Sequence, residues 1–96
     1  MPKAIWNNQV IAEVPVNEIE HAEGNVYFPL TAVKHDYLRP SDTHTTCPWK
    51  SIASYYDVVV DGQVNDDAAW YYPDPYSLAA NLRNHIAFWH GVKVEE

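Results

Sequence analysis

One segment of the chain concentrates the side chains that can do chemistry. Residues 39–51 read Arg-Pro-Ser-Asp-Thr-His-Thr-Thr-Cys-Pro-Trp-Lys-Ser, with no apolar periodicity. Long loops are uncommon in compact domains and often carry function, so we expect a long polar loop here that contributes to a site. Within it, Cys47 could be a nucleophile, with His44 as its base and Lys50 as a nearby cation. The alternative is that Cys47 is a small buried hydrophobe where the loop rejoins the sheet.

A second segment, residues 67–76, supplies aromatic side chains. Ligand pockets have apolar walls and few polar groups, so the polar loop and this aromatic strand together predict a pocket for a small organic or anionic ligand. The residues expected nearest the ligand are Arg39, His44, Thr46, Cys47, Trp49, Lys50 and Trp70. Arg39 and Lys50 would bind anionic groups, and the two Trp side chains would stack. The alternative is that the aromatic residues only fill the core of a small sheet protein.

Other functions are compatible with the same residues. A protein-interaction module would bind through a sheet edge or an aromatic patch, as a monomer or a weak homodimer. A nucleotidyltransferase-like enzyme would need carboxylates for Mg²⁺ and a glycine-rich backbone around phosphates, whereas the chain has three Gly, all at predicted turns. A zinc site could draw on the set His44, Cys47, His85 and His90. No ligand spacing supports that set, so we expect no metal and no other cofactor.

Composition excludes several classes of partner. Thirteen acidic and six basic residues give a formal net charge of −7, which would repel DNA or RNA. There is no leader-like apolar stretch and no run of about eighteen apolar residues, which predicts a cytoplasmic protein without membrane association. The single Cys47 excludes an intrachain disulfide and a Cys-rich zinc knuckle.

Pro and Gly punctuate the chain at the spacing that is typical of antiparallel β structure. The predicted strand pairs are 3–6 with 10–14 through Asn7-Asn8, 19–23 with 25–28 at Gly24, and 52–60 with 64–72 through Asp61-Gly62. Two closing strands, 85–89 and 92–94, are turned at His90-Gly91. A strict two-residue turn in the central hairpin would place Asp57 opposite Asp66, so a bulge near Asn65 is predicted to relieve the repulsion.

Short helices are predicted at two places. Asp74-Pro75 is typical of a helix start, with Leu78 and Leu82 on one face and an end before Asn84. Residues 29–33 predict one more helical turn. Residues 51–61 carry bulky apolar groups at both parities, so both faces of that strand should be covered. The sequence therefore predicts one mainly β domain, 1–96, of two packed antiparallel sheets, tent-like or barrel-like, with one or two short helices.

Four motifs resemble those of a bacterial family. They are Ser41-Asp-Thr-His-Thr-Thr-Cys-Pro-Trp-Lys50, Ala53-x-Tyr-Tyr56, Asp67-Ala-Ala-Trp-x-Tyr-Pro-x-Pro-Tyr76 and His85-Ile-Ala-Phe-Trp89. Over nearly its whole length the chain resembles the family called domain of unknown function 427, sometimes labelled nucleotidyltransferase-like. The resemblance implies a β-tent-like fold of two packed antiparallel sheets and brings no established activity. The family usually has Gly where this chain has Ser51, and often Arg where it has His44.

Overall fold

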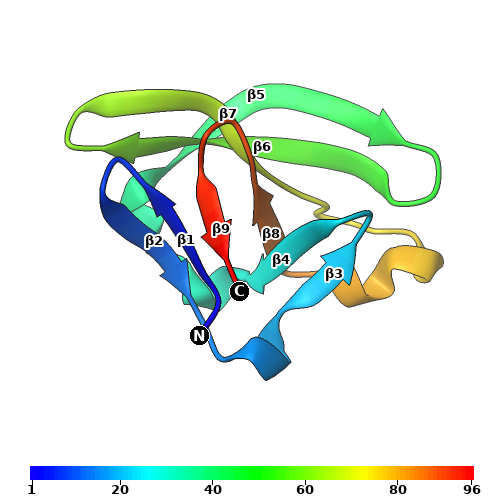
Figure 1. Ribbon diagram of the computed structural model, residues 1–96. Coiled ribbons are helices and arrows are strands. Elements are labelled where there is room, and N and C mark those ends of the chain that lie inside the picture. Colours follow the sequence, from blue (N-terminus) through cyan, green and yellow to red (C-terminus); the bar gives the residue numbers. More distant parts are fainter.

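Two antiparallel sheets make up the fold (Figure 1). A computed structural model describes all 96 residues. The smaller sheet has the order β2-β1-β9, with β1 at Lys3–Trp6, β2 at Gln9–Glu13 and β9 at Lys93–Glu95. The larger sheet has the order β3-β4-β8-β7-β6-β5, with β3 at Glu20–Ala22, β4 at Asn25–Pro29, β5 at Leu38–Cys47, β6 at Ser51–Val60, β7 at Gln63–Tyr71 and β8 at His85–Phe88. The predicted mainly β fold of two packed antiparallel sheets is confirmed.

Tight turns fix the predicted hairpins. The residues with positive φ at the three hairpin tips are Asn7, Asn8, Glu23, Gly24, Asp61 and Gly62. Positive φ at both central residues defines the type I′ turn, whose twist matches that of the flanking strands. All three hairpins are therefore confirmed. The two closing strands do not pair with each other, because β8 joins the larger sheet and β9 pairs with β1 in the smaller one.

Residues 39–51 do not form the predicted polar loop. Leu38–Cys47 is β5, the edge strand of the larger sheet, and only residues 48–50 form a turn before β6. A strand without apolar periodicity is possible at this edge because most of its side chains face solvent, and β-branched Thr favours extended backbone. Pairing with β6 is irregular between Pro40 and His44, where three β5 residues lie opposite Tyr55 alone.

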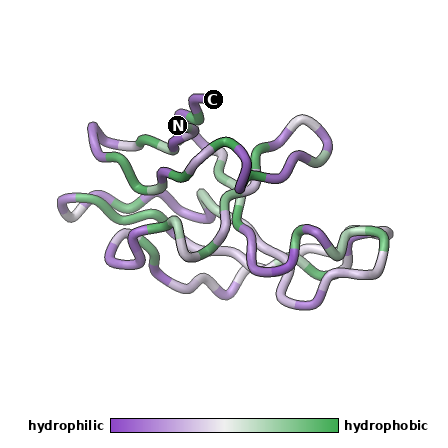
Figure 2. Tube along the Cα trace, turned by 90° about the horizontal axis from the view of Figure 1, so that it is seen from below, coloured by the Kyte–Doolittle hydropathy of each residue, from purple (hydrophilic) through white to green (hydrophobic).

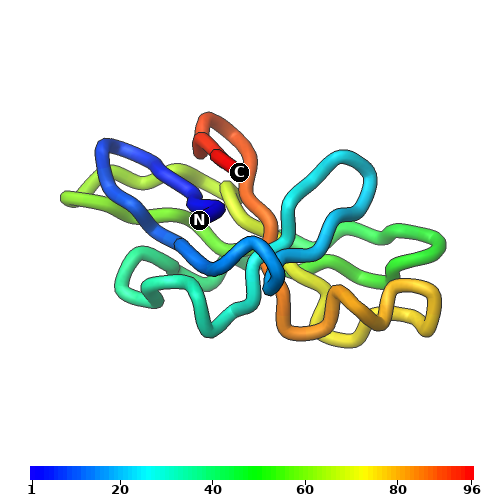
Figure 3. Tube along the Cα trace, turned by 60° about the horizontal axis from the view of Figure 1, so that its bottom comes forward, coloured from blue at the N-terminus to red at the C-terminus, as the bar shows by residue number.

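The tips of the β6–β7 and β5–β6 hairpins lie at opposite ends of the molecule (Figures 1 and 3). The buried apolar side chains form two hydrophobic cores. Figure 2 shows hydrophobic stretches along the strands and hydrophilic residues around several hairpin tips. The first core lies between the two sheets near the β6–β7 tip, and its large side chains include Ile11, Phe28, Val58, Val60, Ile86 and Phe88. The second core lies near the β5–β6 tip and includes Tyr27, Ala53, Tyr55, Trp70, Tyr72 and Leu82.

Strand β6 belongs to both cores. Its alternating side chains send Val58 and Val60 into the first core, and Ala53 and Tyr55, on the opposite face, into the second. The two cores therefore lie on opposite faces of one strand. The expectation that both faces of β6 are covered holds for its second half, whereas Ile52 in the first half remains 55% exposed.

A β-bulge interrupts β6–β7 pairing where β6 passes from one core to the other. Three β7 residues, 66–68, lie opposite Asp57 alone, which confirms the bulge predicted near Asn65. The Oδ1 atom of Asp57 accepts a hydrogen bond of 2.8 Å from the backbone N–H of Asp67. Asp67 has a φ of 53°. The carboxylate of Asp57 thus supplies the hydrogen-bond acceptor that the backbone N–H of Asp67 needs.

The helical segments are short 3-10 turns. They are η1 at Val16–Glu18, η2 at Leu30–Ala32, η3 at His35–Tyr37 and η4 at Ser77–Leu82. The turn predicted at 29–33 is confirmed as η2. The predicted helix start at Asp74 is wrong, because η4 begins at Ser77 and has no side-chain cap. None of these segments has the length and apolar character needed to cross a membrane.

The predicted shared face of Leu78 and Leu82 is also wrong. A 3-10 helix has about three residues per turn, so side chains four apart point in different directions. Leu82 is 1% exposed in the second core, and Leu78 is 82% exposed.

These two leucines give a matched test of the second core. Leu82→Ala should lower the free energy of unfolding by about 2–5 kcal/mol because it leaves a cavity. Leu78→Ala should change it by less than about 0.5 kcal/mol. Urea denaturation followed by tryptophan fluorescence measures both, and equal losses would show that η4 does not pack as described.

Candidate functional site

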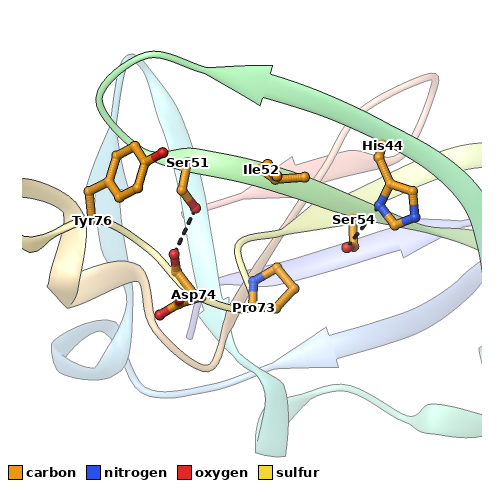
Figure 4. Close-up of a pocket in the computed structure, with 7 residues that line it drawn as sticks. All are labelled: His44, Ser51, Ile52, Ser54, Pro73, Asp74 and Tyr76. Carbon is orange, nitrogen blue, oxygen red and sulfur yellow. Dashed lines mark hydrogen bonds between the residues drawn. The ribbon is translucent and has the colours of Figure 1, made fainter.

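A cavity of about 340 Å³ opens between β5, β6 and the segment that follows β7 (Figure 4). Its lining residues are His44 from β5, Ser51, Ile52 and Ser54 from β6, and Pro73, Asp74 and Tyr76 from the segment after β7. Cavities that hold small molecules have volumes of about 300–1,000 Å³, so this one is large enough for a small ligand.

The cavity exists because the first core covers only part of one face of β6. Val58 and Val60 on that face are buried against the smaller sheet, whereas Ile52 and Ser54 lie farther along the strand. There the face meets residues 73–76 instead, and Ile52 and Tyr76 remain 55% and 54% exposed. Two large side chains at the cavity are thus left uncovered by either core.

Hydrogen bonds hold the polar walls of the cavity in place. The hydroxyl of Ser51 donates to the backbone carbonyl of Asp74 at 2.8 Å, and the backbone N–H of Tyr76 donates to the carbonyl of Lys50 at 3.2 Å. Prolines at 73 and 75 further restrict this segment. On the opposite wall, Ser54 Oγ and His44 Nδ1 are hydrogen-bonded at 3.2 Å (Figure 4).

The two segments that the sequence predicts for the pocket do meet here. Residues 39–51 contribute His44 and Ser51, and residues 67–76 contribute Pro73, Asp74 and Tyr76. The structure does not bring together the seven individual residues predicted nearest the ligand. Of these, His44 alone lines the cavity.

Arg39 lies at the far end of β5 and has a partner. Its Nε and Nη2 atoms donate to Asp57 Oδ2 at 3.1 and 2.9 Å. Asp57 is 7% exposed, and a buried carboxylate requires charged or hydrogen-bonding partners. Arg39 therefore neutralises the residue that holds the bulge, a role that the predicted anion-binding function did not include.

Strand alternation separates Cys47 from its expected base. His44 pairs with Ser54 and Cys47 pairs with Ser51, which places the two side chains on opposite faces of β5. Cys47 packs against the second core, and His44 faces the cavity. The predicted Cys–His pair does not form. Thr46 shares the face of His44 and pairs with Ile52, but it does not line the cavity.

Trp49, Lys50 and Trp70 lie on the second-core side of the β5–β6 hairpin. Trp70 is 8% exposed, and its Nε1–H donates to the hydroxyl of Tyr27 at 3.1 Å. Lys50 is 5% exposed and its ammonium pairs with the carboxylate of Glu23. Burial lowers the pKa of Lys50. Trp70 is packed in the second core with Tyr27, Tyr55 and Tyr72, and it does not line the cavity.

Two lining residues, Ile52 and Ser54, lie outside both predicted segments. Four others belong to those segments but were not among the seven residues expected nearest the ligand: Ser51, Pro73, Asp74 and Tyr76. Ile52 belongs to a run of bulky residues that is typical of a core strand, so no feature of the sequence marks it as exposed. The Pro-Asp-Pro triplet after the aromatic strand was a usable signal, because two prolines form a rigid non-helical segment. The structure contains no group of three or more His, Cys, Asp or Glu side chains placed to hold a metal ion.

These features define a small, mainly β domain of two antiparallel sheets with a cavity beside the long β5–β6 hairpin. The family model described as domain of unknown function 427 matches residues 3–96, and the chain belongs to that family. The resemblance carried by the four sequence motifs is thereby confirmed. Comparison with curated proteins gives no match.

Because Arg39 pairs with the buried carboxylate of Asp57, replacing Arg39 should lower the stability of the fold. Arg39→Met removes two hydrogen bonds from a buried carboxylate and should lower the free energy of unfolding by about 1–3 kcal/mol. Arg83→Met is the matched control, because Arg83 lies 3.6 Å from Asp74 and both side chains are at least half exposed. It should cost less than about 0.5 kcal/mol. Equal values in urea denaturation would contradict a structural role for Arg39.

Asp67 gives a pH-dependent prediction. Hydrogen bonds from the hydroxyls of Ser41, at 2.5 Å, and Thr43, at 2.7 Å, lower its pKa from the ordinary 3.8. A depressed folded-state pKa stabilises the fold above the unfolded value, and this contribution is lost as pH falls below 3.8 toward the folded pKa. The double variant S41A/T43V should therefore raise the pKa of Asp67 and flatten the acid dependence of stability below about pH 4.

Carboxyl carbon NMR titration of Asp67 measures this directly. Thr45→Val is the control, because the Thr45 hydroxyl bonds to Tyr55 and not to Asp67. An Asp67 titration that is the same in S41A/T43V and in the unmodified chain would show that the two hydroxyls do not set its pKa.

Proposed function

We propose that this chain is a small-molecule-binding domain and that its ligand occupies the cavity between the β5–β6 hairpin and residues 73–76. The observation that carries the proposal is the pair of half-exposed side chains Ile52 and Tyr76 at a cavity of about 340 Å³. Exposed apolar surface that converges on a concavity is what small-molecule sites provide. The ligand would cover both side chains.

The lining favours a flat organic molecule with one polar end. Ile52, Pro73 and the ring of Tyr76 offer apolar contact on three sides. The polar groups are the hydrogen-bonded pair of Ser54 and His44, the carboxylate of Asp74 and the hydroxyls of Ser51 and Tyr76. A few polar groups within apolar walls fix the orientation of a ligand rather than supply most of its affinity.

The charge around the cavity favours a neutral or positively charged polar end over an anion. Arg39 and Lys50 were the residues expected to bind an anion, and both are paired with carboxylates away from the cavity. The cavity itself carries the carboxylate of Asp74, and the chain has a formal net charge of −7. Arg83, 3.6 Å from Asp74, offsets part of this local charge, so the repulsion of an anionic ligand rests mainly on the net charge of the chain.

Nucleotidyl transfer is less well supported than ligand binding. Phosphates are usually held by successive backbone N–H groups in glycine-rich turns. The three glycines, at 24, 62 and 91, lie in three separate turns, and none of them lines the cavity.

Three related probes test the proposal: benzyl alcohol, benzylamine and benzoate. In an amide NMR titration of the labelled protein, benzyl alcohol and benzylamine should shift the resonances of Ser54 and Tyr76 saturably. Benzoate should bind more weakly, because it places a second carboxylate near Asp74. If no probe shifts the lining residues, or if the shifts cluster elsewhere, the cavity is not a binding site.

A matched pair of variants locates the binding. Ile52→Ser removes an apolar wall of the cavity and should abolish the saturable shifts. Val64→Ser changes a similarly exposed β-branched residue, 43% exposed on β7 and outside the cavity, and should leave them unchanged. Both exposed substitutions should alter stability by less than about 0.5 kcal/mol. Equal weakening in the two variants would contradict the assignment.

A further inference from the structure

Strand β5 is the one long free edge of the fold. It has ten residues, whereas the edge strands β3 and β9 have three each. The remaining edge strand, β2, is partly covered by the segment that contains Val33, which bridges Ala12. Beyond β5 no further strand is paired (Figure 1). A free edge presents backbone N–H and C=O groups that another extended chain can bind.

The two halves of β5 differ in how this edge is protected. Sheet edges are commonly protected by proline, by charged side chains and by irregular register. The first half has all three, with Arg39, Pro40, Asp42 and an irregular register with β6. Residues 44–47 pair regularly with β6 and carry neither proline nor a Lys, Arg, Asp or Glu side chain. Their outward backbone groups form no hydrogen bond within the chain, so this half of the edge is open to pairing.

The open half of the edge lies beside the cavity. His44 lines the cavity, and Thr46 pairs with Ile52 on the same face of the sheet. A strand added to β5 would lie about 10 Å from β6, which is two spacings of about 4.8 Å. Directly opposite residues point to the same face, so an aromatic side chain opposite Thr46 can pass over this small residue and reach Ile52. One extended chain can therefore use the edge and the cavity together.

We propose that the ligand of the cavity is an extended basic peptide, which adds a strand to β5 and places one aromatic side chain against Ile52. This inference rests on the proposed function, because it uses the same cavity and names the class of ligand. In strand addition, main-chain hydrogen bonds supply affinity and pockets for alternate side chains supply specificity. The flat ring in the cavity is then a tyrosine side chain, whose hydroxyl is the neutral polar end.

The charge of the chain favours a basic peptide. Arg39 and Lys50 are the only Lys or Arg residues of the β5–β6 hairpin, and both are paired with carboxylates. Asp42 on β5 is exposed and forms no ion pair. The chain as a whole has a formal net charge of −7. Opposite charges favour and steer association, so Lys or Arg side chains at the two ends of the peptide fit this surface.

An amide NMR titration with the peptide acetyl-Arg-Thr-Tyr-Thr-Arg-amide tests the proposal on the folded chain. We expect saturable shifts at residues 44–46 of the free edge together with Ser54 and Tyr76 at the cavity. The control peptide carries methyl groups on two adjacent backbone nitrogens, so that one methyl group faces β5 whichever edge of the peptide pairs. It should bind about tenfold more weakly, because it loses main-chain hydrogen bonds. Equal affinity of the two peptides, or no shift at residues 44–46, would overturn the proposal.

The acidic analogue acetyl-Glu-Thr-Tyr-Thr-Glu-amide tests the charge of the peptide. It should bind severalfold more weakly than the basic peptide at low salt, and the difference should shrink as salt is added. An equal or higher affinity for the acidic analogue would contradict a basic peptide as the ligand.

A parallel titration with benzyl alcohol separates this proposal from the proposed function. If benzyl alcohol shifts Ser54 and Tyr76 but the peptide leaves residues 44–46 unchanged, the cavity binds small molecules and strand addition is wrong. If neither probe shifts Ser54 and Tyr76, both proposals are wrong. A stable dimer of the free chain in light scattering, with residues 44–46 protected from amide exchange, would show that a second copy occupies the edge and would overturn only the peptide.

A matched pair of threonine variants locates the added strand. Thr46→Arg places a positive charge and a long side chain between the peptide and Ile52, so it should weaken peptide binding about tenfold. Thr31→Arg makes the same change at an exposed residue of η2, outside the edge and the cavity, and should leave the affinity unchanged. Both variants add one positive charge, so the difference between them reports the position alone. Equal affinities in the two variants would overturn the proposal.

Discussion

The carboxylate of Asp57 is the point on which the larger sheet depends. It is 7% exposed, accepts the backbone N–H of Asp67 with one oxygen and receives Arg39 on the other. One side chain thereby connects three adjacent strands, β5, β6 and β7, where both strand pairs lose regular register. A buried charge is stable only with such partners, so the bulge and the edge strand are held by the same group.

The position of this bulge explains the placement of the cavity. On one side of Asp57, β6 packs into the first core, and on the other side its opposite face packs into the second. The β5–β6 hairpin therefore extends beyond the cover of the smaller sheet, and the face with Ile52 and Ser54 is open. The segment after β7 bends back across this face and is anchored through Ser51 and Lys50. The cavity thus forms because the two halves of β6 pack into different cores through opposite faces.

The same hairpin has two faces with different chemistry. One face presents His44, Ser54 and the cavity, and the other carries Cys47 and the buried amine of Lys50. Residues that are three apart on a strand point to opposite faces, so neighbours in sequence can serve unrelated surfaces. A loop, which the sequence predicted here, would have allowed all of these side chains to converge.

The hairpin turns and the bulge depend on residues that are close in the sequence, so they could be predicted from it. Asn7-Asn8 and Asp61-Gly62 set two hairpins through the positive φ that they tolerate, and the repulsion expected at Asp57 pointed to the bulge. Edge strand β5 could not be predicted by apolar periodicity, because an edge strand with exposed side chains has none. The burial of Lys50 depends on Glu23, a partner 27 residues away whose position follows only from the tertiary fold. The exposure of Ile52 likewise depends on where the smaller sheet ends.

The most direct test of the central claim is a crystal structure of the chain grown with benzyl alcohol. We expect electron density for a ring between Ile52 and Tyr76, with Asp57 bound to Arg39 and to the N–H of Asp67. A structure in which Tyr76 packs onto Ile52 and closes the cavity, or in which the ligand density lies elsewhere, would contradict it.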